Sequence, residues 1–111
     1  MSKFDEKVVL YQGAMKDLGI SFNADLLTKV TKGLGPSIYK KDAETVSGSD
    51  AKELATVKNN FLMKKLGLSD GPKLDSAIEK VMEKMGKSNR NKYRAIVYYL
   101  LVKELGQESK Y

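Results

Sequence analysis

The sequence has no cysteine and no histidine among its 111 residues. Without cysteine it can have no disulfide framework, no thiolate zinc ligand and no cysteine nucleophile, and without histidine it has no imidazole ligand and no serine–histidine triad. The metal ligands that remain are oxygen atoms, methionine sulfur and lysine amines, which suit weak hard-cation sites better than zinc, haem or iron–sulfur centres. We therefore expect no tightly bound transition metal and no redox cofactor.

Long hydrophobic runs are also absent. The longest, residues 95–102, is far shorter than the roughly 18 residues of a membrane-spanning helix, and residues 1–7 lack the apolar segment and cleavage site of a secretion signal. A length of 111 residues, with 41% hydrophobic and 31% charged residues, is typical of one compact globular domain. We expect a single domain over residues 1–111, no membrane contact and a cytoplasmic location.

Acidic residues are fewer than basic ones. There are 14 Asp and Glu against 20 Lys and Arg, which gives a net charge of +6. This charge and the sequence pI near 9.4 favour polyanionic partners through long-range attraction. Attraction alone does not define a function, because a binding site also requires the cations to lie close together.

Four similar phrases end in glycine at irregular intervals: 15–19, 63–67, 82–86 and 102–106. A glycine directly after a last helical turn that carries apolar residues is the usual way to end a helix, because glycine adopts the left-handed conformation at little cost. A duplicated unit is the alternative, but a repeat would have a fixed period. The phrases therefore predict at least four helix ends.

Hydrophobic periodicity and helix-start residues predict about six helices joined by short loops. Asn23 and Ser88 are expected N-caps, Asp50 with Glu53 resembles a capping box, and Pro36 and Pro72 suit first turns. The expected helices span residues 4–18, 23–33, 36–39, 50–66, 70–85 and 88–105. No segment alternates with period two, so we expect an all-α bundle.

The last expected helix is apolar nearly all round over residues 95–102. Its β-branched and aromatic residues also suit a strand, but Arg94 and Lys103 flank it within a capped helical pattern. A helix that is hydrophobic on every side belongs in the middle of a bundle. We expect its inward side chains to lie in the centre of the core, against Leu54, Phe61, Ile78 and Val81. These central side chains are Tyr93, Ile96, Val97, Leu100 and Leu101.

The strongest candidate for anion binding is residues 84–94, an eleven-residue stretch without an acid. Helix-start N–H groups and guanidinium groups there could converge on a phosphate or a carboxylate. The alternative is a solvated or structurally paired surface, in which Arg94 pairs with an acid of a neighbouring helix. The candidate cations are Lys84, Lys87, Arg90, Lys92 and Arg94.

The turn at residues 33–36 resembles a helix-hairpin-helix element, in which a Gly-hydrophobic-Gly turn exposes backbone N–H groups to a phosphate. Lys32 stands where that motif usually has proline, and Tyr39 occupies a position that is usually small. The alternative is a glycine helix end followed by a proline helix start. The candidate residues of this element are Gly33, Gly35, Lys40 and Lys41.

Catalytic patterns are weak. Asp75, Glu79 and Glu83 share one helical face, but lysines alternate with them as on an exposed charged surface. Ser-x-x-Lys occurs at 37–40 and 49–52 without the Ser-Asp-Asn and Lys-Thr-Gly motifs that accompany it in penicillin-recognising enzymes. No acid, base and nucleophile converge in any segment, so we expect no enzymatic activity.

Residues 31–39 (Thr-Lys-Gly-Leu-Gly-Pro-Ser-Ile-Tyr) and residues 88–103 together resemble a family of small bacterial proteins known only as a domain of unknown function. The likeness covers essentially the whole chain. It implies an all-α cytoplasmic bacterial domain without an assigned activity, and it transfers no functional residue.

The sequence therefore favours a noncatalytic all-α domain that binds a polyanion, nucleic acid or an acidic protein, through residues 84–94, assisted by the turn at 33–36. The alternative is a protein–protein interaction or structural module with no nucleic-acid binding. An exposed apolar patch would favour this alternative, and a continuous basic stripe would favour nucleic acid.

Overall fold

The computed structural model describes residues 2–47, 50–86, 89 and 92–111. Within these residues the chain is helical and contains no strand, only an isolated antiparallel bridge between Thr45 and Tyr93. The predicted all-α class is therefore confirmed. The elements are α1 (Lys3–Asp17), α2 (Ala24–Gly33), η1 (Gly35–Tyr39), α3 (Lys41–Glu44), α4 (Ala51–Thr56), η2 (Val57–Lys65), α5 (Pro72–Met85), α6 (Arg94–Glu104) and η3 (Glu108–Lys110).

The predicted number of about six helices is slightly too high. Over the described residues, α4 continues directly into η2, and α3 has only four residues. Five longer helices result, namely α1, α2, the continuous α4–η2 helix, α5 and α6. The segment predicted at 36–39 is η1, a five-residue 3₁₀ helix with Pro36 in its first turn.

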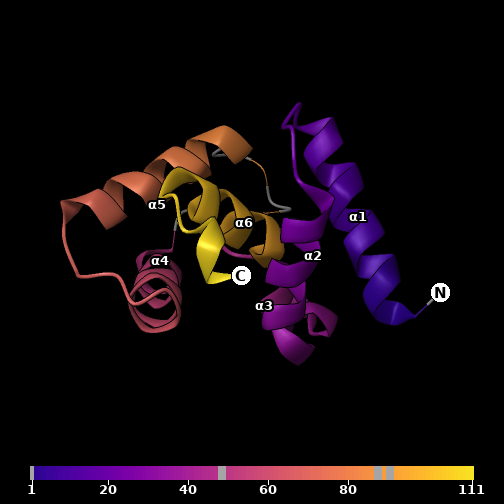
Figure 1. Cartoon of the computed structure of the whole chain (residues 1–111), viewed down its shortest axis with the longest axis horizontal. Helices are drawn as coiled ribbons and strands as arrows, with labels where there is room; N and C mark the ends of the chain where they lie inside the picture. Colours follow the sequence, from indigo (N-terminus) through magenta and orange to yellow (C-terminus); the bar gives the residue numbers. More distant parts are fainter. Residues whose placement is uncertain (1, 48–49, 87–88, 90–91) are drawn as a thin grey trace.

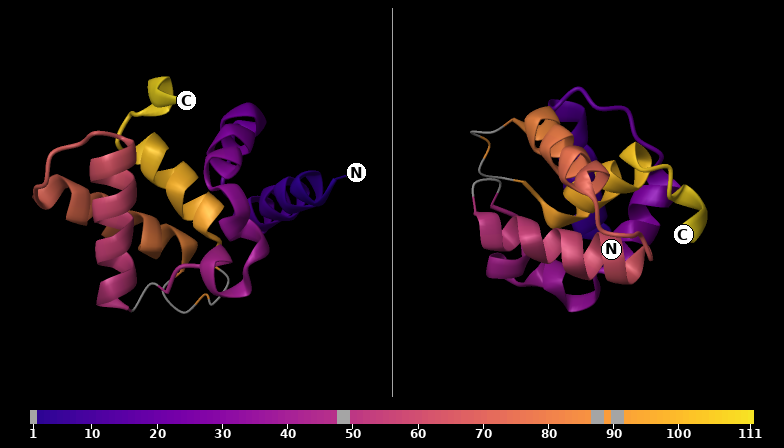
Figure 2. Two further views of the ribbon diagram at one scale, coloured as in Figure 1. Left: turned by 90° about the horizontal axis from the view of Figure 1, so that it is seen from below. Right: turned by 90° about the vertical axis from the view of Figure 1, so that its left-hand side faces the viewer.

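Helix α6 lies in the middle of the molecule, with α2 on one side and α5 on the other (Figure 1). It also contacts α1 and α3, and the two further views show it enclosed by the other helices (Figure 2). Every residue from Ala95 to Val102 is buried, which confirms the predicted central position. Phe61, Ile78 and Val81 are buried as predicted, whereas Leu54 and Tyr93 pack at the edge of the core, partly exposed.

The helix ends follow the predicted signals. Asn23 Oδ1 accepts a hydrogen bond from Leu26 N at 3.2 Å, and the Asp50 side chain accepts one from Lys52 N at 2.9 Å. The capping box is not completed, because Asp50 N donates to Ser47 O and the Glu53 carboxylate pairs with Arg94 instead. The four glycines predicted to end helices all have positive φ: Gly19, Gly67, Gly86 and Gly106.

The second half of the helix predicted at 50–66 is a π-helix rather than an α-helix. Its buried residues are Val57, then Phe61 and Leu62, then Leu66, so the apolar groups recur every four to five residues. The backbone hydrogen bonds of a π-helix join residues i and i+5, so each turn contains more residues than a turn of an α-helix. This spacing keeps all four side chains on the core side, and Leu66 N donates to Phe61 O at 2.9 Å.

The predicted start of α6 is wrong. The helix begins at Arg94 rather than near residue 88, and the expected cap Ser88 lies outside the described residues. Val46 N donates to Lys92 O at 2.8 Å, and Tyr93 bridges Thr45, so the loop after α3 holds residues 92–93 in an extended conformation. None of the helices over the described ranges has both the length and the apolar character needed to cross a membrane.

Candidate nucleic-acid-binding surface

Lys92 is not part of an exposed basic surface. Its side chain is buried, with 2% of the residue exposed, and its Nζ donates to Asn89 O. Burial lowers the pKa of the Lys92 ammonium, because desolvation disfavours its charged form. The prediction that Lys92 faces solvent is therefore corrected: the extended segment before α6 turns this side chain into the molecule.

Arg94 has a structural role. Its Nε donates to Ala43 O at 2.7 Å, and its Nη2 lies 3.5 Å from Glu53 Oε1. The guanidinium also lies 5.8 Å from the ring centre of Tyr98, and the Arg94 side chain is only 12% exposed. Arg94 thus connects the first turn of α6 to α3 and α4, which is the pairing with an acid of a neighbouring helix that the sequence left open.

The predicted stretch 84–94 consequently does not form one basic surface in the part of the chain that is described. Lys84 is exposed in the last turn of α5, whereas Lys92 and Arg94 are turned inward. Lys87 and Arg90 lie outside the described residues. An acid-free run of sequence does not fix which of its cations face solvent.

The turn at 33–36 does not lead into a second α-helix. Gly33 is the last residue of α2, Gly35 has a φ of 63°, and Pro36 starts the 3₁₀ helix η1. This is the predicted alternative of a glycine end followed by a proline start. Lys40 is exposed after η1, and the side chain of Lys41 lies outside the described ones.

Gly33 nevertheless lies in a groove between α2 and the α4–η2 helix. A Cβ atom built on Gly33 would lie 3.7 Å from Cε1 of Tyr111, and a hollow of about 170 Å³ opens beside this contact. The rings of Phe61 and Tyr98 stack below it with centres 3.8 Å apart. The hollow is lined by Val30, Gly33, Leu34, Asn60, Phe61, Lys65, Tyr98 and Tyr111.

A second hollow of about 430 Å³ shares Tyr111 with the first. Lys29 and Lys103 line it, together with the acids Asp25 and Glu108 and two further residues, Asn23 and Leu26. The Lys103 Nζ lies 3.5 Å from Glu108 Oε2. We call the two hollows together the Tyr111 groove, and Figure 1 shows the end of the chain between α2 and α4, where the groove lies.

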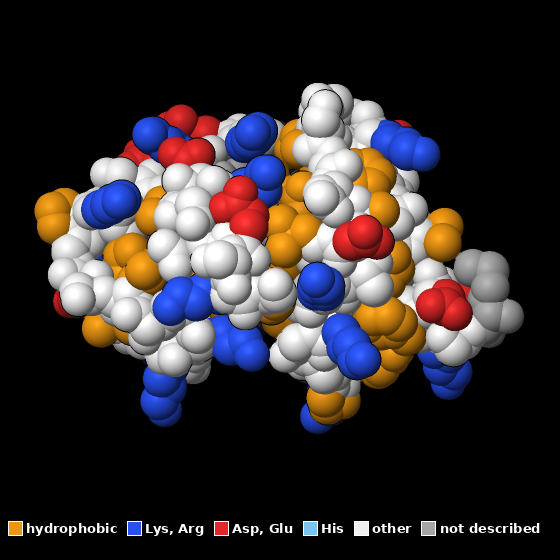
Figure 3. Space-filling view, in the orientation of Figure 1, with side chains coloured by type: hydrophobic (Ala, Val, Ile, Leu, Met, Phe, Trp, Pro, Cys, Tyr) orange, Lys and Arg blue, Asp and Glu red, His pale blue; other side chains and the backbone are white. Residues whose placement is uncertain are grey.

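Further cations lie beside the smaller hollow of the Tyr111 groove, whereas the larger hollow is lined by two lysines and two acids. The Lys65 Nζ lies 5.9 Å from the centre of the Tyr111 ring, and the Lys110 Nζ would lie 3.9 Å from a Cβ atom built on Gly67. Lys29, Lys65 and Lys110 are exposed. In the space-filling view of this face, blue side chains predominate over red ones in the lower half of the molecule (Figure 3).

The sequence contains a signal for this surface, although the predicted site residues do not include most of it. Residues 26–41 contain four lysines and no acid, and residues 54–69 contain three lysines and no acid. These two segments supply both walls of the smaller hollow, Gly33 and Leu34 from one and Asn60 and Lys65 from the other. The fold therefore places two acid-free segments, each as long as 16 residues, on opposite sides of one groove.

Burial raises the pKa of the Tyr111 hydroxyl, and the nearby Tyr98 raises it further. Tyr111 is thus neutral at physiological pH and presents an uncharged ring and a hydrogen-bonding hydroxyl among the lysines. No group of three acidic side chains that could hold a metal ion occurs among the residues with a described placement. Asp75, Glu79 and Glu83 are exposed on α5, and Asp75 pairs with Lys58.

One family model matches residues 10–109, and it is described as a protein of unknown function, DUF2853. No curated protein matches the chain. The match confirms the resemblance to a domain of unknown function that residues 31–39 and 88–103 indicated.

Proposed function

Because the chain belongs to the DUF2853 family, whose description assigns no activity, we propose a function from the surface itself: a noncatalytic domain that binds single-stranded nucleic acid in the Tyr111 groove. The observation that carries the proposal is the convergence of the acid-free segments 26–41 and 54–69 on one aromatic groove. Lysines on such a surface attract phosphates and release their counterions, which gives affinity without base specificity.

The aromatic groups of the groove favour a single strand over a duplex. Proteins that bind single strands combine a positively charged groove with aromatic side chains on which bases stack. Tyr111 is half-buried beside Gly33 and has Lys65 over its ring, and the stacked pair Phe61–Tyr98 lies below. A hollow of about 170 Å³ is smaller than the roughly 300 Å³ at which pockets for drug-sized ligands begin, so it suits one flat group such as a base.

Residues of η2 line the groove at the π-helical turn. Asn60, Phe61 and Lys65 all belong to this nine-residue segment. Single π-helical insertions in proteins occur frequently at functional sites, because the wider turn redirects side chains. Here the wider turn lets Phe61 pack on Tyr98 while Lys65 extends over Tyr111.

The proposal is tested by fluorescence anisotropy with a labelled single strand of mixed sequence and with the same sequence as a duplex, each at two salt concentrations. We expect the wild type to bind the single strand more tightly. Lys65→Glu should weaken binding and lower the log–log salt slope by about 0.7 for each lost phosphate contact. Tyr111→Ala should cost about 1–3 kcal/mol if one base stacks on the ring.

The matched control is Lys84→Glu. Lys84 is an exposed lysine of the originally predicted stretch 84–94, and this variant changes the total charge by the same amount as Lys65→Glu. We expect a much smaller effect from Lys84→Glu. Equal losses from the two variants would mean that only net charge matters, and no binding by the wild type at low salt would overturn the proposal.

A second candidate function is the protein–protein interaction module. It is favoured by one specific observation, which is that Val9 and Leu10 on α1 are about half exposed, at 54% and 42%. Exposed apolar side chains that adjoin a groove often mark an interaction site.

A further inference from the structure

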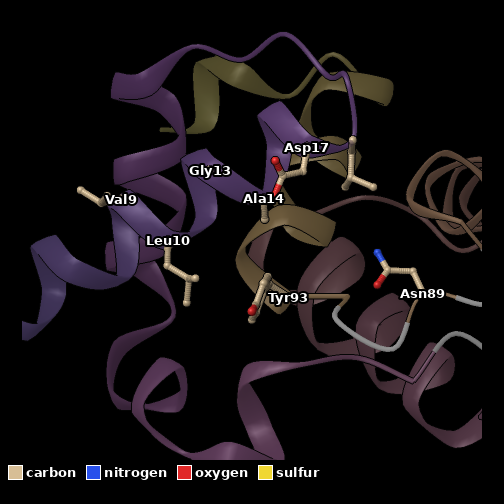
Figure 4. Close-up of a pocket in the computed structure, with 8 residues that line it drawn as sticks. Val9, Leu10, Gly13, Ala14, Asp17, Asn89 and Tyr93 are labelled. Atoms are coloured by element: carbon tan, nitrogen blue, oxygen red, sulfur yellow. The ribbon is translucent and has the colours of Figure 1, made fainter.

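The outward face of α1 carries an apolar groove. Over the described residues, the large hydrophobic side chains that are exposed are Val9, Leu10 and Tyr39, and two of these are adjacent on α1. Leu10 and Tyr93 lie on the wall of a hollow of about 380 Å³, and Figure 4 shows Gly13 and Ala14 following Leu10 along the helix. The lining residues are Val9, Leu10, Gly13, Ala14, Asp17, Leu18, Asn89 and Tyr93.

The charges of helix α1 balance, as do those of α5. Helix α1 contains three lysines and three acids, so its net charge is zero, whereas the whole chain carries +6. Two copies of a cationic protein repel each other wherever their lysine-rich faces meet. The α1 face is therefore a place where two copies can approach without net repulsion.

The exposed residues of α1 also form a stripe that is complementary to the same stripe on a second copy. Glu6, Val9, Gly13 and Lys16 are all exposed and follow the spacing i, i+3, i+7, i+10, which is one stripe along the helix. The acid lies in the first turn and the lysine in the last turn. When two such helices lie antiparallel, Glu6 of each copy faces Lys16 of the other, and Val9 of each faces Gly13.

Gly13 provides the space that this pairing needs. A Cβ atom built at Gly13 would have no neighbour within 4 Å, so the surface there is open. A glycine in the middle of a helix costs stability, and in a helix pair it allows the two backbones to approach closely. The side chain of Val9 from a second copy fits over this position.

We propose that the protein self-associates through α1, forming a two-fold symmetric dimer in which the α1 helices of two copies pair antiparallel. Such an interface is isologous, so each contact occurs twice. Fifteen residues of helix are only about 22 Å long. The area is thus below that of a stable complex, and the dimer is weak and forms at high protein concentration.

Sedimentation equilibrium of the full chain over a concentration series tests the proposal. The average mass should rise from 12.4 kDa towards twice that value. Glu6→Lys and Lys16→Glu should each lower the association constant about tenfold, because each substitution creates two like-charge contacts in the dimer. The double variant Glu6→Lys/Lys16→Glu should restore association, since it exchanges the two charges. Gly13→Gln should abolish association by blocking the close approach.

Tyr39→Glu is the matched control. It removes an exposed hydrophobic group of similar exposure, 47%, outside the groove and should leave the association constant unchanged. Circular dichroism of each variant verifies that the helices are retained. The proposal is overturned if the average mass stays at the monomer value up to about 1 mM protein. At that concentration even a Kd of about 1 mM would raise the average mass. Failure of the double variant to restore association would overturn the antiparallel pairing.

Discussion

Tyr11 joins α1 to α3 through a buried hydroxyl. The side chain is fully buried, and its hydroxyl donates to Glu44 Oε2 at 2.7 Å. The same oxygen accepts a hydrogen bond from Lys7 Nζ at 2.7 Å, and the Tyr11 ring lies 5.1 Å from that of Tyr93. Burial, followed by the hydrogen bond to the Glu44 carboxylate, raises the pKa of Tyr11 well above its usual range.

This raised pKa predicts a loss of stability at alkaline pH. Above the unfolded pKa of about 10, the unfolded chain releases the tyrosine proton while the folded chain retains it. The free energy of unfolding should therefore fall as pH rises past about 10. In Tyr11→Phe this part of the decline should be absent, and at pH 7 the variant should lose about 0.5–1.5 kcal/mol with its hydrogen bond.

Urea denaturation of both proteins from pH 7 to pH 11 measures this difference. Tyr39→Phe is the control, because Tyr39 is exposed and its hydroxyl is available to water in the folded and unfolded chains alike. A parallel alkaline decline in wild type and Tyr11→Phe would show that another group causes it.

The sequence shows which residues are charged, but it does not show which of their side chains are exposed to solvent. The cations of residues 84–94 could be counted in advance, but Lys92 and Arg94 proved to be inside the fold. What places them there is a partner distant in sequence: Glu53 for Arg94, and the backbone of Val46 for the segment of Lys92. Local sequence carries no information about such partners.

At the scale of elements, most helix ends could be predicted because their signals are local. An N-cap such as Asn23, or a glycine such as Gly19, satisfies backbone groups of the adjacent turn and needs no distant contact. The start of α6 and the π-helical form of η2 could not be predicted. The first depends on the loop after α3, and the second depends on which side chains the core accepts.

Substitution of glycine by alanine should have opposite effects on stability at two positions, one within α1 and one directly after it. Gly13 is helical and Gly19 has a φ of 70°, and a Cβ atom at either position would have no neighbour within 4 Å. Gly13→Ala should stabilise the monomer by about 0.5–1 kcal/mol, because alanine restricts the unfolded chain and favours the helix. Gly19→Ala should destabilise it by about 1–2 kcal/mol, because the left-handed conformation strains a Cβ atom.

Thermal and urea unfolding at low protein concentration, where self-association is negligible, measures both changes. Each variant serves as the control for the other, since the local space is open at both sites and only the backbone conformation differs. Changes of the same sign would show that the difference in backbone conformation between Gly13 and Gly19 does not decide the effect.

At the scale of the whole molecule, the core was the most predictable feature and the candidate site the least. The apolar run at 95–102 identified the central helix, because a helix that is hydrophobic on all sides has no stable place at the surface. The Tyr111 groove is assembled from α2, η2, α6 and Tyr111, which are far apart in sequence. Composition showed that cations were in excess, but only the packing of these elements shows where they gather.

Leu100→Ala tests the central role of α6. Leu100 is 4% exposed on the helix that contacts α1, α2, α3 and α5. Because so many elements pack around it, the surrounding side chains have little freedom to fill the space that the substitution creates. The variant should lose about 2–5 kcal/mol of unfolding free energy, the range for large-to-small substitutions in rigid cores.

Chemical denaturation followed by both circular dichroism and tyrosine fluorescence measures this loss and verifies that unfolding stays two-state. At low protein concentration, where self-association is negligible, Val9→Ala is the control, since it removes apolar groups from a side chain that is 54% exposed and should change stability by less than about 0.5 kcal/mol. A loss below about 1 kcal/mol in Leu100→Ala would mean that α6 is not held rigidly on all sides.

The groove residue Tyr98 also lies on α6, so a loosened helix would displace one wall of the Tyr111 groove. Tight packing around Leu100 is therefore also a condition for the geometry of the proposed binding surface.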